Sequence, residues 1–230
     1  GLGIPAEPLF RSFALASSTG DTILLRAGVY SEQEKFPIVL DHAVTIEGED
    51  GAVLDSPRFK TMVSVMADGV TLRNIRFQVR KWGIVADVSR AMTVEDCEFV
   101  LGDEECRTSS TAIWLRGMKE CAIRRCTFRQ VGICIAGDPL SDKSAGKTVL
   151  TGMCEAGEDP EYFSTHEIAD CTINGRPYYY FVGQDNLTVP TDAGGLIAVE
   201  CNNLTVRDID VSDSSICSDG NRRGSFLNCP

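Results

Sequence analysis

The sequence predicts an all-β protein and, within that class, a β-solenoid, in which one chain winds through stacked coils of parallel strands. Two observations predict this fold. A six-residue pattern recurs along the chain at the spacing of solenoid coils, roughly 20 to 45 residues. No amphipathic stretch of helical length separates the copies, which argues against a helix-covered α/β fold. β-Sandwiches also use many short strands, but they do not require one hexapeptide to recur.

The pattern is an apolar residue, any residue, a bend residue, two further residues and a second apolar residue. Its copies occupy residues 72–77, 94–99, 123–128, 168–173 and 206–211, with a degenerate first copy from Ile46. The long gap between Ile123 and Ile168 leaves room for a further copy near residues 148–150. A weaker apolar column follows the copies at residues 83–86, 112–115, 132–135 and 196–199.

The apolar positions of the pattern predict the core, because alternate residues of a strand face the same side. The expected core residues are Ile23, Leu25, Ile46, Leu72, Ile75, Phe77, Val94, Phe99, Ile123, Phe128, Ile168, Val206 and Val211.

We expect a single domain over residues 1–230, with about eight or nine coils. Residues 1–19 are expected to cap the first coil, with a helix around residues 8–17, and residues 174–190 to form a hairpin-like insertion. No apolar run approaches the roughly 18 residues of a membrane span, so we expect no membrane insertion. Residues 1–5 lack the charged and apolar regions of a signal peptide.

The net charge of −11, from 33 acidic and 22 basic residues, argues against a nucleic-acid partner. Lysine and arginine must supply the contacts to phosphate, and here they are outnumbered. Such a balance is typical of a solvated outer surface or of one that collects cations.

Ten cysteines in one chain favour an oxidising, extracellular compartment. The alternatives are buried thiols and a metal-thiolate site, although no pair has C-x-x-C spacing. The sequons at Asn186 and Asn203 are candidate glycosylation sites and agree with an extracellular location. The disulfide candidates are Cys97, Cys106, Cys121, Cys126, Cys134, Cys154, Cys171, Cys201, Cys217 and Cys229.

The repeat indicates where several cysteines point. Cys97, Cys126 and Cys171 occupy one position of the pattern, where Ile75 and Ile209 stand in other copies. They are therefore expected to face inward, either as disulfides between adjacent coils or as stacked small apolar side chains. Among the others, Cys134 and Cys217 are expected to face outward, and Cys106, Cys154 and Cys229 to lie in loops or at the terminus.

Residues 20–30 and 44–48 resemble the first coils of right-handed parallel β-helix proteins, the family of pectate-lyase-like enzymes and NosD-type carbohydrate-binding and sugar-hydrolysis repeats. Residues 172–180 through 203–206 resemble the hairpin and return coil of the NosD-type repeats. The resemblance covers roughly residues 18–213. It implies a right-handed parallel β-helix, but not one function, because enzymes, binding modules and surface proteins all use this fold.

Catalytic motifs are missing, so the interpretation leans away from an enzyme. The polygalacturonase-like motifs do not occur. Residues 175–178 resemble the last pectin-methylesterase motif, but the acidic residues of that family's site are missing, and we interpret this segment as a turn. With only two histidines, His42 and His166, a histidine-based triad or zinc site has no support.

Two weaker features remain as candidate sites. Asp208 and Asp210 are weak calcium candidates, since alternate residues share one face of a strand, although a solvated acidic face explains them as well. The tyrosine run at Tyr178, Tyr179 and Tyr180 consists of sugar-stacking candidates or of a packed hairpin. Apart from calcium, no cofactor is expected.

The function expected from these observations is structural. The chain would be a non-catalytic extracellular protein whose only definite partner is itself, a homopolymer forming a cell-envelope sheath or S-layer held by disulfides. A carbohydrate-binding or polysaccharide-processing β-helix protein is the alternative. A NosD-type copper-delivery protein is the third hypothesis, but no cluster of methionine and histidine supports it.

Overall fold

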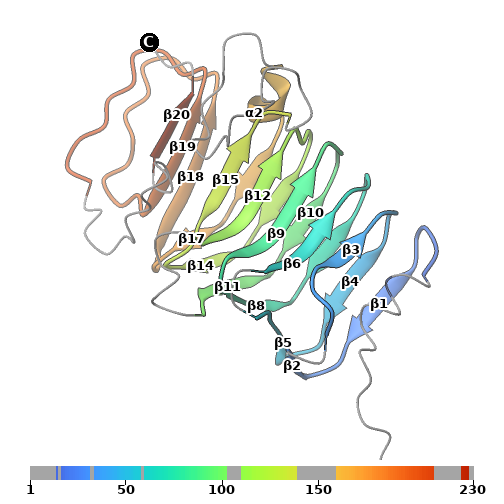
Figure 1. The fold of residues 1–230 in the computed structure, drawn as a ribbon. Coiled ribbons are helices and arrows are strands. Elements are labelled where there is room, and N and C mark those ends of the chain that lie inside the picture. Colours follow the sequence, from blue (N-terminus) through green and yellow to red (C-terminus); the bar gives the residue numbers. More distant parts are fainter. Residues whose placement is uncertain are drawn as a thin grey trace, which may run out of the picture.

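The computed structural model describes Ala14 and residues 17–31, 34–57, 60–102, 110–138, 159–209 and 224–227. This part of the chain is all-β and consists of parallel sheets whose strands stack side by side along one direction (Figure 1). One short helix, α2 (Glu161–Ser164), lies at the end of the stack near β15. Within these residues no helix is long and apolar enough to cross a membrane.

The strands form three sheets. Sheet 1 has six strands, in the order β1 (Thr22–Leu25), β4 (Thr45–Gly48), β7 (Thr71–Arg73), β10 (Thr93–Glu95), β13 (Ala122–Arg124) and β16 (Glu167–Ala169). Sheet 2 has nine, in the order β2 (Gly28–Tyr30), β5 (Ala52–Asp55), β8 (Arg76–Val79), β11 (Glu98–Leu101), β14 (Thr127–Arg129), β17 (Thr172–Ile173), β18 (Arg176–Val182), β19 (Gly195–Val199) and β20 (Gly224–Leu227). Sheet 3 has five, in the order β3 (Ile38–Leu40), β6 (Thr61–Val65), β9 (Trp82–Asp87), β12 (Thr111–Arg116) and β15 (Ile133–Ala136).

From β1 to β15, consecutive strands enter sheets 1, 2 and 3 in turn, and each strand from β1 to β14 pairs in parallel with the strand three places later. The register brings equivalent residues of the repeat together. Val94 lies opposite Leu72 on one side and Ile123 on the other, and Phe99 lies opposite Phe77 in the same way. Each column of the repeat is therefore a physical stack along the direction in which the strands add.

Aromatic rings show how tightly one column packs. Phe99 stacks on Phe77 and Phe128 with ring centroids 4.6 and 5.2 Å apart, close to the spacing of neighbouring strands. Tyr178 meets the edge of the Phe128 ring at 5.9 Å and continues the column. The column thus lies in the middle of a continuous apolar core.

Left-handed bends connect sheets 1 and 2. Asn74, Asp96, Arg125 and Asp170 occupy the bend position of the repeat, with φ between 52 and 54°. One residue in this conformation turns the chain, and asparagine and aspartate tolerate it better than most. At the first bend the backbone approaches so closely that a Cβ on Gly48 would lie 2.1 Å from the carbonyl oxygen of Asn74, which requires glycine.

Most of the predicted core is confirmed. Leu25, Ile46, Leu72, Ile75, Phe77, Val94, Phe99, Ile123, Phe128 and Ile168 are buried, and Ile23 packs partly buried against them. The prediction is wrong for Val206, which is 44% exposed. It follows the isolated bridge of Thr188 with Thr205, outside sheet 1, and therefore lacks the neighbours of a sheet 1 column. Val211 lies outside the described residues.

The prediction of a further copy near residues 148–150 within sheet 1 is wrong. β13 pairs directly with β16, Ala122 opposite Glu167, so sheet 1 has no place for another strand between them. Residues 139–158 lie outside the described part of the chain, as does most of the expected cap. Of that cap's helix, Ala14 is helical and packs buried in the core cluster.

Within the expected insertion at residues 174–190, a hairpin begins. β17 and β18 pair antiparallel around Asn174 and Gly175, both with positive φ, which is typical of a two-residue hairpin turn. β18 then pairs in parallel with β19. Tyr178 and Tyr180 of β18 pack on the main core, whereas Tyr179 packs on a second, smaller apolar cluster. The β18–β19 sheet is therefore a wall between two cores.

Candidate functional site

Five cysteines share one structural position, directly after a residue with positive φ. They are Cys97, Cys121, Cys126, Cys171 and Cys201. The thiol of each donates to the carbonyl oxygen two residues earlier, at sulfur–oxygen distances of 3.3 to 3.6 Å. Each of these carbonyls already accepts a backbone N–H at 2.9 to 3.2 Å and has a second lone pair for another donor. Cysteine supplies one from a side chain small and apolar enough for the core.

These thiols are poor nucleophiles. Burial raises the pKa of Cys121 to about 12, and the pKa of Cys171 is raised by its side-chain hydrogen bond with Cys126 and by burial. Cys126 also forms a side-chain hydrogen bond with Cys97, so the three cysteines of the repeat form one sulfur column. Because the thiolate is the reactive form, Cys121, Cys126 and Cys171 are inert in the folded protein.

The sequence left disulfides and stacked thiols open for the inward cysteines, and the structure has stacked thiols. Cys97, Cys121, Cys126 and Cys171 are not in disulfides. Cys134 lies on the outer side of sheet 3, opposite Trp114 of β12, as expected for an outward position. Cys106, Cys154, Cys217 and Cys229 lie outside the described residues.

The outer face of sheet 3 carries both tryptophans of the chain. Trp82 of β9 and Trp114 of β12 lie with ring centroids 6.0 Å apart, and both are half-buried. The Lys81 ammonium lies 5.1 Å from the Trp82 ring centroid, and the Arg116 guanidinium lies 5.0 Å from that of Trp114. Each cation faces an indole ring, an arrangement that stabilises both groups.

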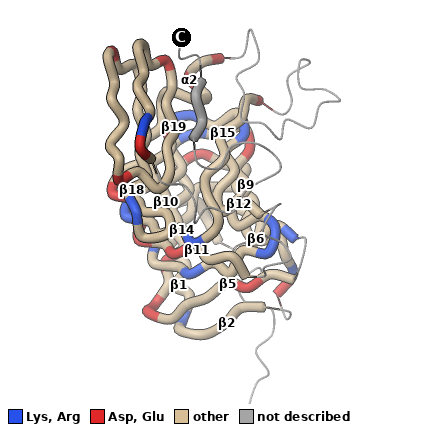
Figure 2. Tube along the Cα trace, turned by 90° about the vertical axis from the view of Figure 1, so that its left-hand side faces the viewer, with Lys and Arg blue, Asp and Glu red and all other residues tan. Residues whose placement is uncertain are grey.

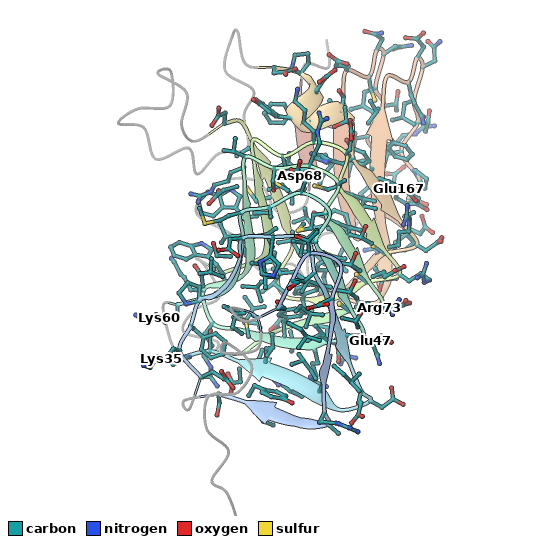
Figure 3. All side chains as sticks on the ribbon, turned by 90° about the vertical axis from the view of Figure 1, so that its right-hand side faces the viewer. Lys35, Glu47, Lys60, Asp68, Arg73 and Glu167 are labelled. Carbon is teal, nitrogen blue, oxygen red and sulfur yellow. The ribbon has the colours of Figure 1, made fainter. Side chains whose placement is uncertain are left out.

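Three lysines follow the edge of this face. Lys35, Lys60 and Lys81 each lie three residues before the same inward position of β3, β6 and β9, so the parallel register aligns them in one column. Figure 3 shows Lys35 and Lys60 on the side of the molecule opposite Glu47 and Arg73. None of the three ammonium groups pairs with a carboxylate of the described residues.

The other side of the molecule has its charges paired. Glu47 and Arg73 of sheet 1 form a 2.7 Å ion pair, and Arg125 contacts both Glu95 and Asp96 at 2.7 to 2.8 Å. Figure 2 shows acidic and basic positions side by side in this region, near β10, β11 and β14. The lysine column therefore stands out as a local basic stripe on an acidic protein.

The sheet 3 face also has an unused donor. The indole N–H of Trp114 is buried and has no acceptor. The two arginines nearby are held in place, Arg80 by Asp55 and Arg116 by Asp87, each through two contacts of 2.5 to 3.2 Å. The face therefore combines fixed aromatic rings with donors that lack acceptors, a combination suited to a ligand rich in anionic oxygens. We call this surface the tryptophan–lysine face.

Sequence reasoning missed the tryptophan–lysine face. Its lysines precede the strands of the weaker repeat column, and only the register of sheet 3 aligns them. The signal available in the sequence was that both tryptophans fall beside a basic residue, Lys81 next to Trp82 and Arg116 two residues after Trp114.

The sugar-stacking prediction for the tyrosine run is wrong for two of its members. Tyr178 is 4% exposed and packs on Phe128, and burial raises the pKa of Tyr180, whose hydroxyl donates to the Phe163 carbonyl. Tyr179 stacks on Phe181, with centroids 5.5 Å apart. The run is a packed strand between two cores.

The two sequons lie in one stack. Asn186 and Asn203 both have positive φ, and the Asn203 side-chain amide donates to the Asn186 side-chain oxygen at 2.7 Å. Thr188 and Thr205 form a parallel bridge beside them. The recurrence of Asn-Leu-Thr is thus explained by stacking, and glycosylation of the two exposed asparagines stays a prediction.

Of the two weak calcium candidates, Asp208 and Asp210, only Asp208 lies within the described residues. Asp208 is exposed at a left-handed bend. In the described ranges, no three histidine, cysteine or acidic residues gather as a metal site would require.

Comparison of the chain with protein-family models, with curated proteins and with solved structures gives no match. The resemblance to the β-helix family therefore stays a prediction from the sequence.

Thiol labelling tests the role assigned to the bend cysteines. With a thiol reagent and no reductant, Cys97, Cys121, Cys126 and Cys171 should stay unlabelled in the folded protein and react once it is denatured, because burial alone protects them. Peptide mapping by mass spectrometry identifies the labelled positions. Failure of these four to react after denaturation would show that they are oxidised and that the role is misassigned.

Proposed function

We propose that the chain is a right-handed parallel β-helix that serves as a rigid scaffold and binds an anionic polysaccharide on the tryptophan–lysine face. The observation that carries the proposal is the column of Lys35, Lys60 and Lys81, which has no carboxylate partners among the described residues, beside the only two tryptophans. The role is binding and not catalysis, and its setting is extracellular, where such polymers occur.

The topology supports the β-helix. Strand triplets from β1–β3 to β13–β15 repeat the same order of sheets, and each triplet adds one strand to every sheet. Chains that wind in this way are solenoids, and parallel β-strand crossovers are almost always right-handed. The number of coils and the N-terminal cap belong to this proposal.

Electrostatics and chemistry support the choice of ligand. An acidic chain gains little from an isolated basic stripe unless an anion binds there, because unpaired lysines on one column repel one another. Pyranose rings pack on tryptophan faces through their apolar C–H sides. A polymer that carries repeated carboxylates or sulfates can satisfy the rings and the ammonium groups together.

A binding role fits the positions of both histidines. His42 contacts Asp41 and Ser17, and His166 is buried beside α2. Neither stands on the tryptophan–lysine face, so no imidazole is available there as a general base.

Self-assembly is the second candidate, favoured by apolar side chains on edge strands. Leu24 of β1 and Val29 of β2 are 48% and 65% exposed, and each of these strands is the first in its sheet. An edge strand with exposed apolar residues can pair with another copy of the chain. The bend thiols make disulfides a weaker part of this hypothesis, because these thiols are buried.

Ligand binding can be measured through the tryptophans, because both lie on the proposed face. Polygalacturonate should change their fluorescence, whereas neutral dextran should bind much more weakly. The triple variant Lys35→Gln/Lys60→Gln/Lys81→Gln should bind polygalacturonate at least about tenfold more weakly and with less salt dependence, because fewer counterions are released. Arg26→Gln, at an exposed arginine paired with Glu49, is the control and should bind like the wild type. Equal binding by the triple variant would overturn the proposal.

Light scattering at increasing protein concentration tests self-assembly. If edge pairing drives it, the wild type should form larger species, and Leu24→Lys/Val29→Lys should stay monomeric, because charges on an edge strand block pairing. The same result with and without reductant would show that disulfides are not required. A wild type that stays monomeric throughout rules this candidate out.

A further inference from the structure

His166 is a buried histidine that joins α2 to a bend of the main stack. Its Nδ1 accepts the backbone N–H of Cys121 at 3.2 Å, so the proton of the neutral ring is on Nε2, which donates to the Tyr162 carbonyl at 2.8 Å. One residue earlier, the Thr165 hydroxyl accepts the backbone N–H of Glu120 at 3.0 Å. Two side chains thus supply the acceptors for the backbone of this bend.

At the equivalent bend one triplet earlier, the acceptor is backbone. There the N–H of Ala91 donates to the Lys119 carbonyl at 3.0 Å. At the bend after β12, the side chains of Thr165 and His166, which come directly before β16, take the place of that backbone carbonyl. This bend is therefore held in part by an imidazole, whose hydrogen bonds depend on its protonation state.

Several other groups face this contact. Lys119 forms 2.6 Å ion pairs with Asp159 and Glu161, and its ammonium lies 5.2 Å from the Tyr162 ring centroid. The Tyr180 hydroxyl donates to the Phe163 carbonyl, and Phe163 is buried in the main core. The titratable and charged groups around His166 are Lys119, Glu120, Cys121, Asp159, Glu161, Tyr162, Glu167 and Tyr180.

We propose that His166 is an acid-sensitive latch, whose protonation releases the α2 segment from the bend at residues 119–121 while the three sheets stay folded. A protonated ring would carry a proton on Nδ1 and point it at the N–H of Cys121, donor against donor. It would also place an unpaired charge in the core. Both effects are relieved when α2 moves away and the ring reaches water.

The direction in which the pKa of His166 is shifted agrees with this geometry. Burial lowers the pKa of His166, although its bond to Tyr162 acts in the opposite direction. In the released state, the imidazole has the ordinary histidine pKa, near 6.5. The latch therefore weakens as the pH falls below about 6.5. It weakens no further once the pH is below the lowered pKa of His166 in the closed state.

The Lys119–Asp159 ion pair stays formed over the same range. The hydrogen bond to Lys119 lowers the pKa of Asp159, and the pKa of Lys119 is raised by its bonds to Asp159 and Glu161. Tyr180 and Cys121 have raised pKa values and stay protonated. Compared with Lys119, Cys121, Asp159 and Tyr180, the imidazole is therefore the group that changes charge between pH 7.5 and 4.5.

Hydrogen exchange at pH 7.5 and 4.5, corrected for the intrinsic pH effect, tests the latch in the whole chain. Amides of residues 120–121 and 161–166 should lose protection by about tenfold per pH unit below 6.5, until the lowered pKa is reached, whereas sheets 1 to 3 keep theirs. Asparagine at position 166 places an acceptor near Nδ1 but cannot titrate, so His166→Asn should abolish the pH response. His42→Asn should keep it.

Two results would overturn the latch: unchanged protection of residues 161–166 in the wild type at pH 4.5, or an equal pH response in His166→Asn. If that variant does not fold, NMR titration of the wild type decides instead. With the His42 signals assigned from His42→Asn, the other imidazole must titrate below its ordinary range and together with the Tyr180 ring signals. Independent titration contradicts the proposal.

Discussion

Parallel pairing in register is the constraint on which this structure depends. Each strand from β1 to β14 lies beside the strand three places later, so a residue within a sheet has its equivalents directly above and below it. Apolar residues then form continuous columns, such as the stacked rings of Phe77, Phe99 and Phe128. The same constraint acts on the bends, where each left-handed residue must lie over the previous one. A repeat of bend and core residues in the sequence is the direct consequence.

The constraint also explains the unusual cysteine content. A residue after a left-handed bend faces the core and lies near a backbone carbonyl that accepts one backbone N–H and can accept a second hydrogen bond. Isoleucine at position 75 fills the space, whereas Cys97, Cys126 and Cys171 fill it and also donate a hydrogen bond. A high cysteine count is usually evidence of an oxidising compartment. At these bends it has a structural explanation that requires no oxidant.

Parts of the molecule that follow the repeat could be predicted from the sequence, and parts that leave it could not. The strands and core of sheets 1 and 2 were predictable because Leu72, Val94 and Ile123 recur with a bend residue two places later. The error at Val206 arose because the same local pattern continues after the chain has entered the second cluster. The tryptophan–lysine face and the contacts of His166 depend on register and on tertiary packing, which a local pattern does not encode.

Cross-linking of introduced cysteines measures the register most directly. Thr71 and Thr93 lie opposite each other on the outer side of sheet 1, at the roughly 4.8 Å spacing of neighbouring strands, which a disulfide can span. Thr45 lies one strand further, about 10 Å from Thr93, beyond the reach of a disulfide. Mild oxidation should therefore link Thr71→Cys with Thr93→Cys, and should leave Thr45→Cys with Thr93→Cys unlinked, as read by peptide mapping. Linkage of the second pair and not the first would contradict the in-register parallel stack.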